Sequence, residues 1–318
     1  MKKYNQSINN ISNSLEEEVT RLKKEMNGVI LAHYYQDEEI QDIADFVGDS
    51  LDLSRKAAQT DADVIIFCGV TFMAEVAKIL SPEKTVIIPD MNAGCSLEES
   101  CQPKDFKKFR EQNPDHIAIT YINCSAEIKA LSDIIVTSTN AKKIVDQIPK
   151  SQPIIFAPDQ HLGRYIAKES NREMLLWQGS CIVHEQFSEK ELVKLKVRHP
   201  EAKIIAHPEC PENLLNYADH IGSTSSLINF VKQNQNAEFI VLTEPNIIHK
   251  MRQENPSAKF YDCKFIDQSG CTLCNNCPYM QLNNMEKLHH ILKMHSQGKT
   301  INEINLDKDL AQKAKNSL

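Results

Sequence analysis

The sequence has no long apolar run and no excess of positive charge. No segment approaches the roughly 18 apolar residues that a membrane-spanning helix requires. The first residues, MKKYNQSINNISNSLEEEV, carry Asn, Ser and Glu where a secretory signal would have its apolar core. Lys and Arg number 36 against 43 Asp and Glu, a net charge of −7, which argues against nucleic acid or an anionic membrane as a partner held by bulk electrostatics. We therefore expect a cytoplasmic protein that binds neither and that holds any anionic ligand through a local set of donors.

A disulfide framework is not expected, although the chain has 10 cysteines. In a reducing compartment, metal binding or catalysis better explains cysteines that cluster. Three of them stand at two-residue gaps in CTLCNNCPY, residues 271–279, with a proline after the third and no further cysteine beyond it. A closed structural zinc site takes four ligands, and the bacterial ferredoxin run has a fourth cysteine before its proline. A 4Fe–4S cluster on three cysteines would instead leave one iron open as a Lewis acid, which suits dehydration or condensation chemistry.

Short apolar, β-branched runs alternate with amphipathic stretches along the chain. The clearest runs are GVILAHYY, DVIIFCGV, KTVIIPDM, HIAITYIN, SDIIVTST, QPIIFAPD, AKIIAHPE and EFIVLTEP. Continuous apolar runs joined by helical connections indicate parallel strands that are covered on both faces. The pattern therefore predicts an α/β fold.

Three stretches, beginning at Ile30, Ala118 and Ile204, align with one another without a gap. An aspartate recurs in register as Asp45, Asp133 and Asp219. We therefore predict three pseudo-threefold-related αβα (Rossmann-like) units, each with a short parallel sheet, around a central active site. The expected boundaries are a helical segment at 1–27, units at 28–100, 101–186 and 187–280, and a C-terminal helical segment at 281–318.

Polar residues recur where the first two strands of each unit end, the edge at which parallel α/β sheets bind ligands. After the first strand these are His33, Tyr121 and His207, followed two residues later by Tyr35, Asn123 and Glu209. After the second strand they are Asp49–Ser50, Thr137–Ser138 and Ser223–Thr224. The hydroxyl pairs have two interpretations: helix N-caps, or a shared site for phosphate and carboxylate groups.

The third strand of each unit runs into a cysteine, and these three residues are Cys95, Cys181 and Cys277. Three units around an axis would point all three at one centre. Cys68, within an apolar run, is expected to be a small core residue. Cys271 and Cys274 lie outside the repeat.

A longer set of motifs resembles the quinolinate synthase family. The matching segments are LAHYYQ, DIADFVGDSLDLSR, FCGVTFMAEVAKIL, PDMNAGCS, TYINCSAEIKA, DQHLGRY, AHPEC, GSTSSL and CNNCPYM. They extend from about Gly28 to about Leu288, in order. The resemblance implies a pseudo-threefold α/β enzyme with one 4Fe–4S cluster. It also implies condensation of iminoaspartate with dihydroxyacetone phosphate to quinolinate, phosphate and water, in de novo NAD synthesis, with coupling to an enzyme that supplies iminoaspartate.

The resemblance also assigns roles to individual residues. The cluster ligands would be Cys95, Cys181 and Cys277. The acid, base and nearby groups would be Tyr35, Glu209, His33 and His207, with Glu209 the base near the reacting carbons and His184 facing the cluster. The residues around the substrate carboxylates and phosphate would include Ser50, Tyr121, Asn123, Ser138, Ser223 and Thr224.

Other interpretations stay open at the level of sequence. The chain could be a different 4Fe–4S hydro-lyase that acts on a small hydroxy acid. It could also be a zinc or electron-transfer module in which Cys271, Cys274 and Cys277 act as one unit. If only Cys277 is a ligand, Cys271 and Cys274 are hypothesised to form a reversible disulfide. We expect Trp177 to be a packing residue, and His289, His290 and His295 to lie on a solvated helix face rather than to bind metal.

Overall fold

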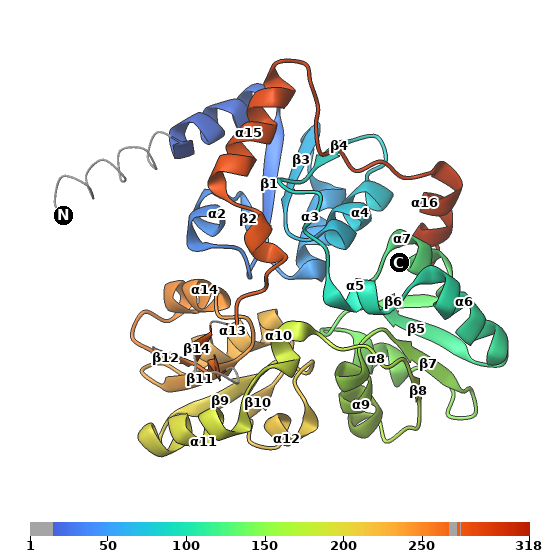
Figure 1. Ribbon diagram of the computed structural model, residues 1–318, viewed down its shortest axis with the longest axis vertical. Coiled ribbons are helices and arrows are strands. Elements are labelled where there is room, and N and C mark those ends of the chain that lie inside the picture. Colours follow the sequence, from blue (N-terminus) through green and yellow to red (C-terminus); the bar gives the residue numbers. More distant parts are fainter. Residues whose placement is uncertain (1–14, 267–271, 274) are drawn as a thin grey trace. The chain divides into compact units, whose positions relative to one another are not determined.

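The computed structural model describes residues 15–266, 272–273 and 275–318. Within these residues, the chain forms three four-stranded sheets of parallel strands flanked by helices (Figure 1). The chain divides into two compact units. The first comprises the residues up to Gly94 together with Pro278–Leu306, and the second comprises Cys95–Cys277 together with Asp307–Leu318.

The first unit contains one of the sheets. Its strands are β1 (Gly28–His33), β2 (Phe46–Gly48), β3 (Val64–Cys68) and β4 (Thr85–Ile87). Its helices and 3₁₀ turn are residues 15–25, α2 (Glu38–Ile43), α3 (Ser50–Gln59), α4 (Thr71–Leu80), η1 (Met280–Leu282) and α15 (Met285–Ser296).

The second unit contains the other two parallel sheets. The strands of one are β5 (Ile117–Tyr121), β6 (Ile134–Val136), β7 (Ile154–Ala157) and β8 (Leu175–Leu176); those of the other are β9 (Lys203–Ala206), β10 (His220–Ile221), β11 (Glu238–Leu242) and β12 (Lys259–Asp262). A small antiparallel pair, β13 (Phe265–Ile266) and β14 (Thr272–Leu273), follows β12. The helices are α5 (Ser96–Ser100), α6 (Pro103–Gln112), α7 (Ala126–Ala130), α8 (Ala141–Val145), α9 (Gln160–Glu169), α10 (Ile182–Glu185), α11 (Glu189–Arg198), α12 (Glu212–Leu215), α13 (Thr224–Gln233), α14 (Ile247–Glu254) and α16 (Lys308–Lys315).

The three sheets share one topology. Their strand orders are β2-β1-β3-β4, β6-β5-β7-β8 and β10-β9-β11-β12, so the second strand of each set always lies at one edge and the fourth at the other. Every apolar run singled out in the sequence forms a strand. The predicted α/β class and the presence of three similar units are therefore confirmed.

The recurring aspartate joins the first two strands of each sheet. Asp45, Asp133 and Asp219 each accept a hydrogen bond through Oδ2 from the backbone N–H fifteen residues earlier, at 2.8, 2.7 and 2.7 Å. The backbone N–H of each aspartate donates in return to the carbonyl of that same earlier residue. The aspartate thus fixes where the second strand begins to pair, and this requirement explains its recurrence.

The core of the first unit includes chain segments from both ends of the sequence. Val19 and Leu22, from the helix at residues 15–25, pack with Leu288 and Leu292 of α15 in the same cluster as β1 and β3. Cys68 is fully buried in this cluster, and burial raises the pKa of its thiol to about 12. It is therefore a small core residue, as expected.

The end of the chain packs in the second unit. Helix α16 lies against α7, and the backbone N–H of Ile135 in β6 donates to the carbonyl of Ser317 at 2.7 Å. The buried hydroxyl of Ser317 donates to the carbonyl of Lys129 at 2.9 Å. The last residues therefore close the free edge of β6.

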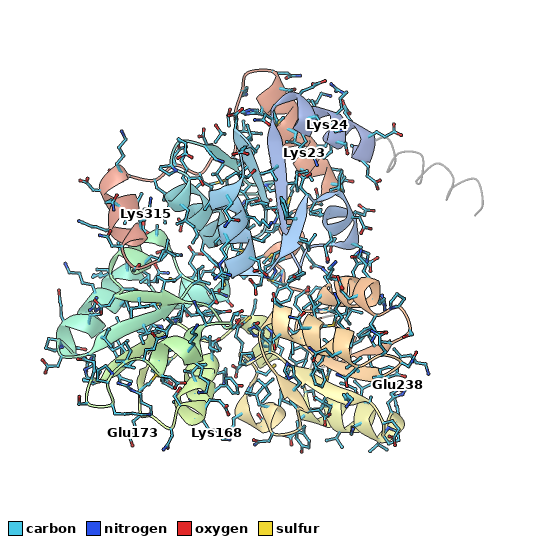
Figure 2. All side chains as sticks on the ribbon, turned by 180° about the vertical axis from the view of Figure 1, so that it is seen from behind. Lys23, Lys24, Lys168, Glu173, Glu238 and Lys315 are labelled. Carbon is cyan, nitrogen blue, oxygen red and sulfur yellow. The ribbon has the colours of Figure 1, made fainter. Side chains whose placement is uncertain are left out.

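None of the helices in the described residues is long and apolar enough to cross a membrane. Charged side chains extend from the surface of each unit, as Lys24, Lys168, Glu173 and Lys315 illustrate (Figure 2).

Candidate active site

Cys95, Cys181 and Cys277, which the sequence placed after a third strand, come after the fourth strand of each sheet, and all three belong to the second unit. Cys95 and Cys181 each stand directly before a helix, α5 and α10 respectively. Cys277 lies in a segment after β14 that forms neither helix nor strand. All three are free thiols of intermediate exposure, so they are neither sealed in the core nor fully open to solvent.

The three thiols lie close enough to influence one another's ionisation. Burial raises the pKa of Cys95 well above its usual value, and the charge of Cys277 raises it further, against the backbone N–H groups of Glu98 and Leu97, which lower it. Burial likewise raises the pKa of Cys181, and the charges of Glu209, Cys95 and Cys277 add to the effect. A bound cation would relieve this repulsion, because metal binding favours the thiolates. The set therefore fits a thiolate-bound metal centre.

Two close contacts hold the segments that carry Cys95 and Cys181. Ser96, which follows Cys95, accepts a hydrogen bond through Oγ from the N–H of Ile182, which follows Cys181, at 3.1 Å. Gly179 is packed so tightly that a Cβ there would lie 2.5 Å from the carbonyl oxygen of Pro158 and would also clash with the hydroxyl of Ser100. The segments that carry Cys95 and Cys181 are thus held against each other.

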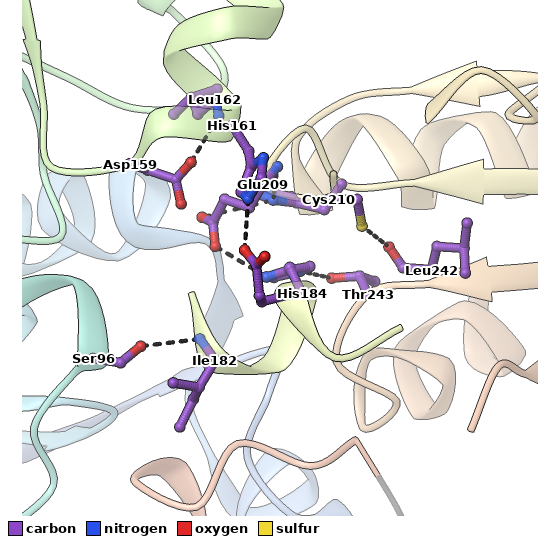
Figure 3. Close-up of polar contacts among 12 residues, drawn as sticks. Ser96, Asp159, His161, Leu162, Ile182, His184, Glu209, Cys210, Leu242 and Thr243 are labelled. Carbon is purple, nitrogen blue, oxygen red and sulfur yellow. Dashed lines mark hydrogen bonds and ion pairs between the residues drawn. The ribbon is translucent and has the colours of Figure 1, made fainter. Parts of the chain in front are cut away.

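Glu209 is a buried carboxylate between two imidazoles and a phenol. Its Oε2 lies 3.0 Å from Nδ1 of His184, and its Oε1 lies 3.6 Å from Nδ1 of His207 and accepts a 2.7 Å hydrogen bond from the hydroxyl of Tyr121. The imidazoles of His184 and His207 are tilted by 30° with centroids 5.0 Å apart. His184 also shares a hydrogen bond with Thr243, between Nε2 and Oγ1, at 3.0 Å. Figure 3 shows Glu209, His184 and Thr243 in this arrangement.

The neighbours of Glu209 decide its charge. Burial alone would raise the pKa of this carboxyl. The positive charges of His207 and His184, with hydrogen bonds from His184 and Tyr121, outweigh burial and hold the pKa well below its usual range. Glu209 therefore favours its charged form here.

One group of side chains in the described part of the chain has the geometry of a metal site. Ligand atoms of Cys181, His184 and Glu209 all lie within 4.8 Å of one another. Sulfur, nitrogen and oxygen donors of this kind suit zinc or iron. The group adjoins the three thiols through Cys181, so all these residues make up one candidate centre.

Asp159 is a member of this region that the sequence did not single out. It is fully buried, its Oδ1 accepts a hydrogen bond from the N–H of Leu162 at 2.7 Å, and its Oδ2 has no hydrogen-bond partner among the described residues. Burial and the charge of Glu209 raise its pKa. Asp159 follows β7, just as Thr243 follows β11. Their position at the carboxyl ends of strands was the available signal, but the polar residues expected at a ligand site came only from the ends of the first two strands of each unit.

The other predicted residues of the second unit occupy two kinds of position. Asn123 follows β5 and has a buried side-chain oxygen without a hydrogen-bond partner in the described residues. Ser138 is half-buried in the turn after β6. Ser223 is the N-cap of α13 and accepts from the N–H of Ser226 at 3.3 Å, and Thr224 is the buried first residue of that helix. Helix capping therefore accounts for Ser223, whereas Asn123 presents an unused polar atom.

His33, Tyr35 and Ser50 belong to the first unit. His33 is the last residue of β1, is 6% exposed, and accepts a hydrogen bond through Nδ1 from the N–H of Tyr35 at 3.1 Å. The two rings are nearly perpendicular, with centroids 4.5 Å apart. Ser50 is the half-buried first residue of α3, which Asp49 caps.

The tryptophan and the C-terminal histidines, which were not expected to belong to the site, have structural partners. Trp177 packs its ring edge-to-face with Phe109, with centroids 5.4 Å apart, and donates to the carbonyl of Ser100 at 3.1 Å, as expected of a packing residue. His289 lies 2.8 Å from Glu18, and His295 contacts Thr300 at 2.9 Å. Cys271 and Cys274, the hypothesised redox pair, lie outside the described residues.

Three parallel sheets and a half-buried centre of thiols, imidazoles and a carboxylate define an α/β protein with a candidate metal site. Comparison with known families makes this specific. A family model described as "Quinolinate synthetase A protein" matches residues 17–318, and the chain belongs to this family. The resemblance seen in the sequence motifs is thereby confirmed.

Individual relatives agree with the family match. A quinolinate synthase of Trichodesmium erythraeum is 57% identical over 291 residues, which cover 92% of this chain and 89% of the relative. A quinolinate synthase of Ehrlichia chaffeensis is 56% identical over 305 residues, 96% of each chain. One from Prochlorococcus marinus is 61% identical over 270 residues, 85% of this chain and 80% of the relative.

Proposed function

We propose that this protein is an enzyme that forms quinolinate. In the proposed reaction it condenses iminoaspartate (iminosuccinate) with dihydroxyacetone phosphate and releases phosphate and water, as a transferase of de novo NAD biosynthesis in the cytoplasm. The observation that carries the proposal is the nearness of three thiols in a chain of the quinolinate synthase family: Cys277 raises the pKa of Cys95, and both raise the pKa of Cys181. These three residues lie far apart in the sequence, and no structural zinc motif requires them to meet.

Cys95, Cys181 and Cys277 are the proposed ligands of one 4Fe–4S cluster. Thiolates are the usual ligands of such clusters, and these three are of intermediate exposure. With three protein ligands, the bound cluster would supply one open iron as a Lewis acid. The domain boundaries set out from the sequence, which assign one of these cysteines to each unit, stay a prediction.

The residues around Glu209 are proposed to hold and move protons. Ring closure with loss of water requires proton transfer at several atoms, and each transfer requires a positioned acid or base. Glu209 is a weak base while both neighbouring imidazoles are charged, because their charges lower its pKa. We therefore propose that His184 and His207 donate and accept protons during the reaction and that Glu209 orients them. Glu209 would act as the base only once an imidazole has lost its proton. His33 and Tyr35 keep the acid–base roles that the family resemblance implies.

Polar groups at strand and helix ends are proposed to bind the two carboxylates and the phosphate. These groups are Ser50, Tyr121, Asn123, Ser138, Ser223 and Thr224. Hydroxyls and free N–H groups bind such anions without net positive charge, which accords with a chain of charge −7. Because water hydrolyses imines, we also propose functional coupling to an enzyme that supplies iminoaspartate.

The direct test is anaerobic purification, iron and sulfide analysis, and a quinolinate assay with both substrates. We expect Cys95→Ser, Cys181→Ser and Cys277→Ser each to remove most of the iron and sulfide and to abolish product. Cys68→Ala is the matched control, since this thiol lies in the first unit's core, and it should keep both.

Other outcomes separate the alternatives. Protein that stays colourless after cluster reconstitution and forms no quinolinate would contradict the proposal. Turnover of a hydroxy acid without the triose phosphate would identify a different hydro-lyase. If Cys95→Ser and Cys181→Ser both left the metal content unchanged, the C-terminal cysteines would form a separate zinc or electron-transfer module.

A further inference from the structure

The turn after β11 carries two buried polar side chains that face the candidate active site from consecutive positions. Thr243 and Glu244 are both 0% exposed. A buried carboxylate is costly unless hydrogen bonds satisfy it. Glu244 accepts through Oε2 from the N–H of Asn246 at 2.8 Å, and through Oε1 from the side-chain amide of Asn276 at 3.2 Å and the N–H of Cys277 at 3.3 Å. One carboxylate thus joins the β11 turn to the segment that ends in Cys277.

That segment has no helix or strand of its own at residues 275–277. Side chains hold it in place instead. Asn275 is 2% exposed and donates to the carbonyl of Cys263 at 3.4 Å, and Asn276 donates both to Glu244 and to Asn246, the latter at 3.1 Å. The backbone N–H of Cys277 has Glu244 as its acceptor, so the direction of the Cys277 thiol depends on this carboxylate.

Thr243 contacts a different residue of the site, His184. Its hydroxyl lies 3.0 Å from Nε2 of His184, whose Nδ1 lies 3.0 Å from Glu209. A neutral imidazole has one donor nitrogen and one acceptor nitrogen. With the carboxylate of Glu209 at Nδ1, the proton is favoured there, and the Thr243 hydroxyl can donate to Nε2. The threonine hydroxyl therefore orients the His184 ring and supports the tautomer that Glu209 favours.

We propose that Thr243 and Glu244 are positioning residues of this site, Glu244 for the thiol of Cys277 and Thr243 for the imidazole of His184. The inference rests on the proposed function, since the roles of Cys277 and His184 are themselves proposed. Neither side chain needs to touch substrate. The β11 turn thus contacts both a proposed cluster ligand and a proposed proton carrier from two adjacent residues.

The test for Glu244 uses Glu244→Gln, which keeps the shape but leaves one acceptor oxygen for three donors. The matched control is Glu238→Gln at the start of the same strand, where the carboxylate pairs with Lys259 at 2.9 Å and is more accessible to solvent. We expect alkylation of Cys277 in the metal-free full-length chain to accelerate about tenfold, the factor that loss of one charge-assisted hydrogen bond corresponds to. Cys95 and Cys181 should react at unchanged rates. In the reconstituted holoenzyme, iron release to a chelator should accelerate as well.

A purely structural role predicts a different pattern. If Glu244→Gln accelerated alkylation of all three cysteines equally, or left Cys277 within twofold of the parent chain, the positioning role would be overturned. Faster alkylation of Cys277 alone, in a protein whose parent chain never takes up iron and sulfide, would support the positioning role and refute the proposed function instead. The two failures are thus distinguishable.

The test for Thr243 compares Thr243→Val with Thr243→Ser. Valine keeps the shape without the hydroxyl, and serine restores the hydroxyl. We expect the ¹⁵N signals of His184 in histidine-labelled full-length chain to shift toward a mixture of tautomers in the valine variant and to return to the parent pattern in the serine variant. Identical signals in all three chains would overturn the assignment of Thr243.

Discussion

At the scale of single residues, the carboxylate of Glu209 shows how neighbours can outweigh burial. Its exposure is 3%, and a carboxyl group so deeply buried would ordinarily hold its proton. The imidazoles of His184 and His207 and the hydroxyl of Tyr121 reverse that preference. Asp159 is buried near the same carboxylate without such partners, and burial and the charge of Glu209 raise its pKa. Two buried carboxyl groups thus have opposite proton affinities, a pattern that enzymes use to separate acid from base.

Asp90 offers a clean test of pH dependence away from this centre. Burial raises the pKa of its carboxyl, but hydrogen bonds from Lys287 and Asn92 and the charge of Lys287, 2.6 Å away, lower it overall. A lowered folded-state pKa contributes stability above the unfolded-state pKa of about 4 and loses it as the pH falls through the folded-state value. Asp90→Asn should therefore lower the free energy of unfolding by about 0.5–1 kcal/mol at pH 7, and the loss should shrink toward pH 3.

Urea unfolding of the metal-free chain between pH 3 and 7 measures this difference. Asp61→Asn, an exposed aspartate of the same unit, is the control and should change stability little at any pH. A loss for Asp90→Asn that stayed constant or grew toward pH 3 would contradict the assigned direction of the pKa shift.

At the scale of elements, the repeated aspartate makes a prediction for strand pairing. Asp219 accepts from the N–H of Ile204 at 2.7 Å and donates its own backbone N–H to the Ile204 carbonyl. Asp219→Ala removes the side-chain acceptor and leaves the Ile204 N–H without it. We expect a loss of about 1–2 kcal/mol in the free energy of unfolding, measured by chemical denaturation.

The same substitution in the other repeats sharpens this test. Asp45 and Asp133 also pair with Lys23 and Arg110, at 2.6 and 2.7 Å, so Asp45→Ala and Asp133→Ala should cost at least as much. Glu201→Ala, an exposed position just before β9, is the control. If the three aspartate variants were as stable as this control, the recurrence of the residue would need another explanation.

The strands and the repeat could be predicted from the sequence because both are local patterns. A buried parallel strand appears as a continuous apolar run, and a polar residue that serves one hydrogen bond recurs at a fixed spacing, as Asp45 and Asp219 do. Asp159 and Thr243 stand at strand ends, but no recurring pattern marks the roles of Thr243, Glu244 and Asp159. Each has its role through a residue that is distant in the sequence, such as Cys277 for Glu244, and neither Thr243 nor Glu244 has an equivalent in the first repeat. Only the folded chain brings such partners together.

At the scale of the whole molecule, the C-terminal residues are divided between the two units. Helix α15 packs in the core of the first unit, whereas residues 307–318 pack in the second. The second unit is therefore completed only when the last residues of the chain are present. The contacts are specific: the Ser317 carbonyl accepts a hydrogen bond from β6, and the Ser317 hydroxyl donates one to a carbonyl at the end of α7.

Deletion of residues 307–318 should consequently loosen the second unit and spare the first. The Ile135 amide, which donates to Ser317 at 2.7 Å, would lose its acceptor, and α7 would lose its covering helix. We expect the hydrogen-exchange protection of Ile135 to fall by about tenfold, the equivalent of roughly one backbone hydrogen bond, while amides of β1 stay protected. Ser317→Ala is the control, because it removes the hydroxyl but keeps the carbonyl, and it should leave Ile135 protected. If the truncated chain kept Ile135 protected, or lost protection equally in β1, residues 307–318 would not stabilise the second unit through these hydrogen bonds.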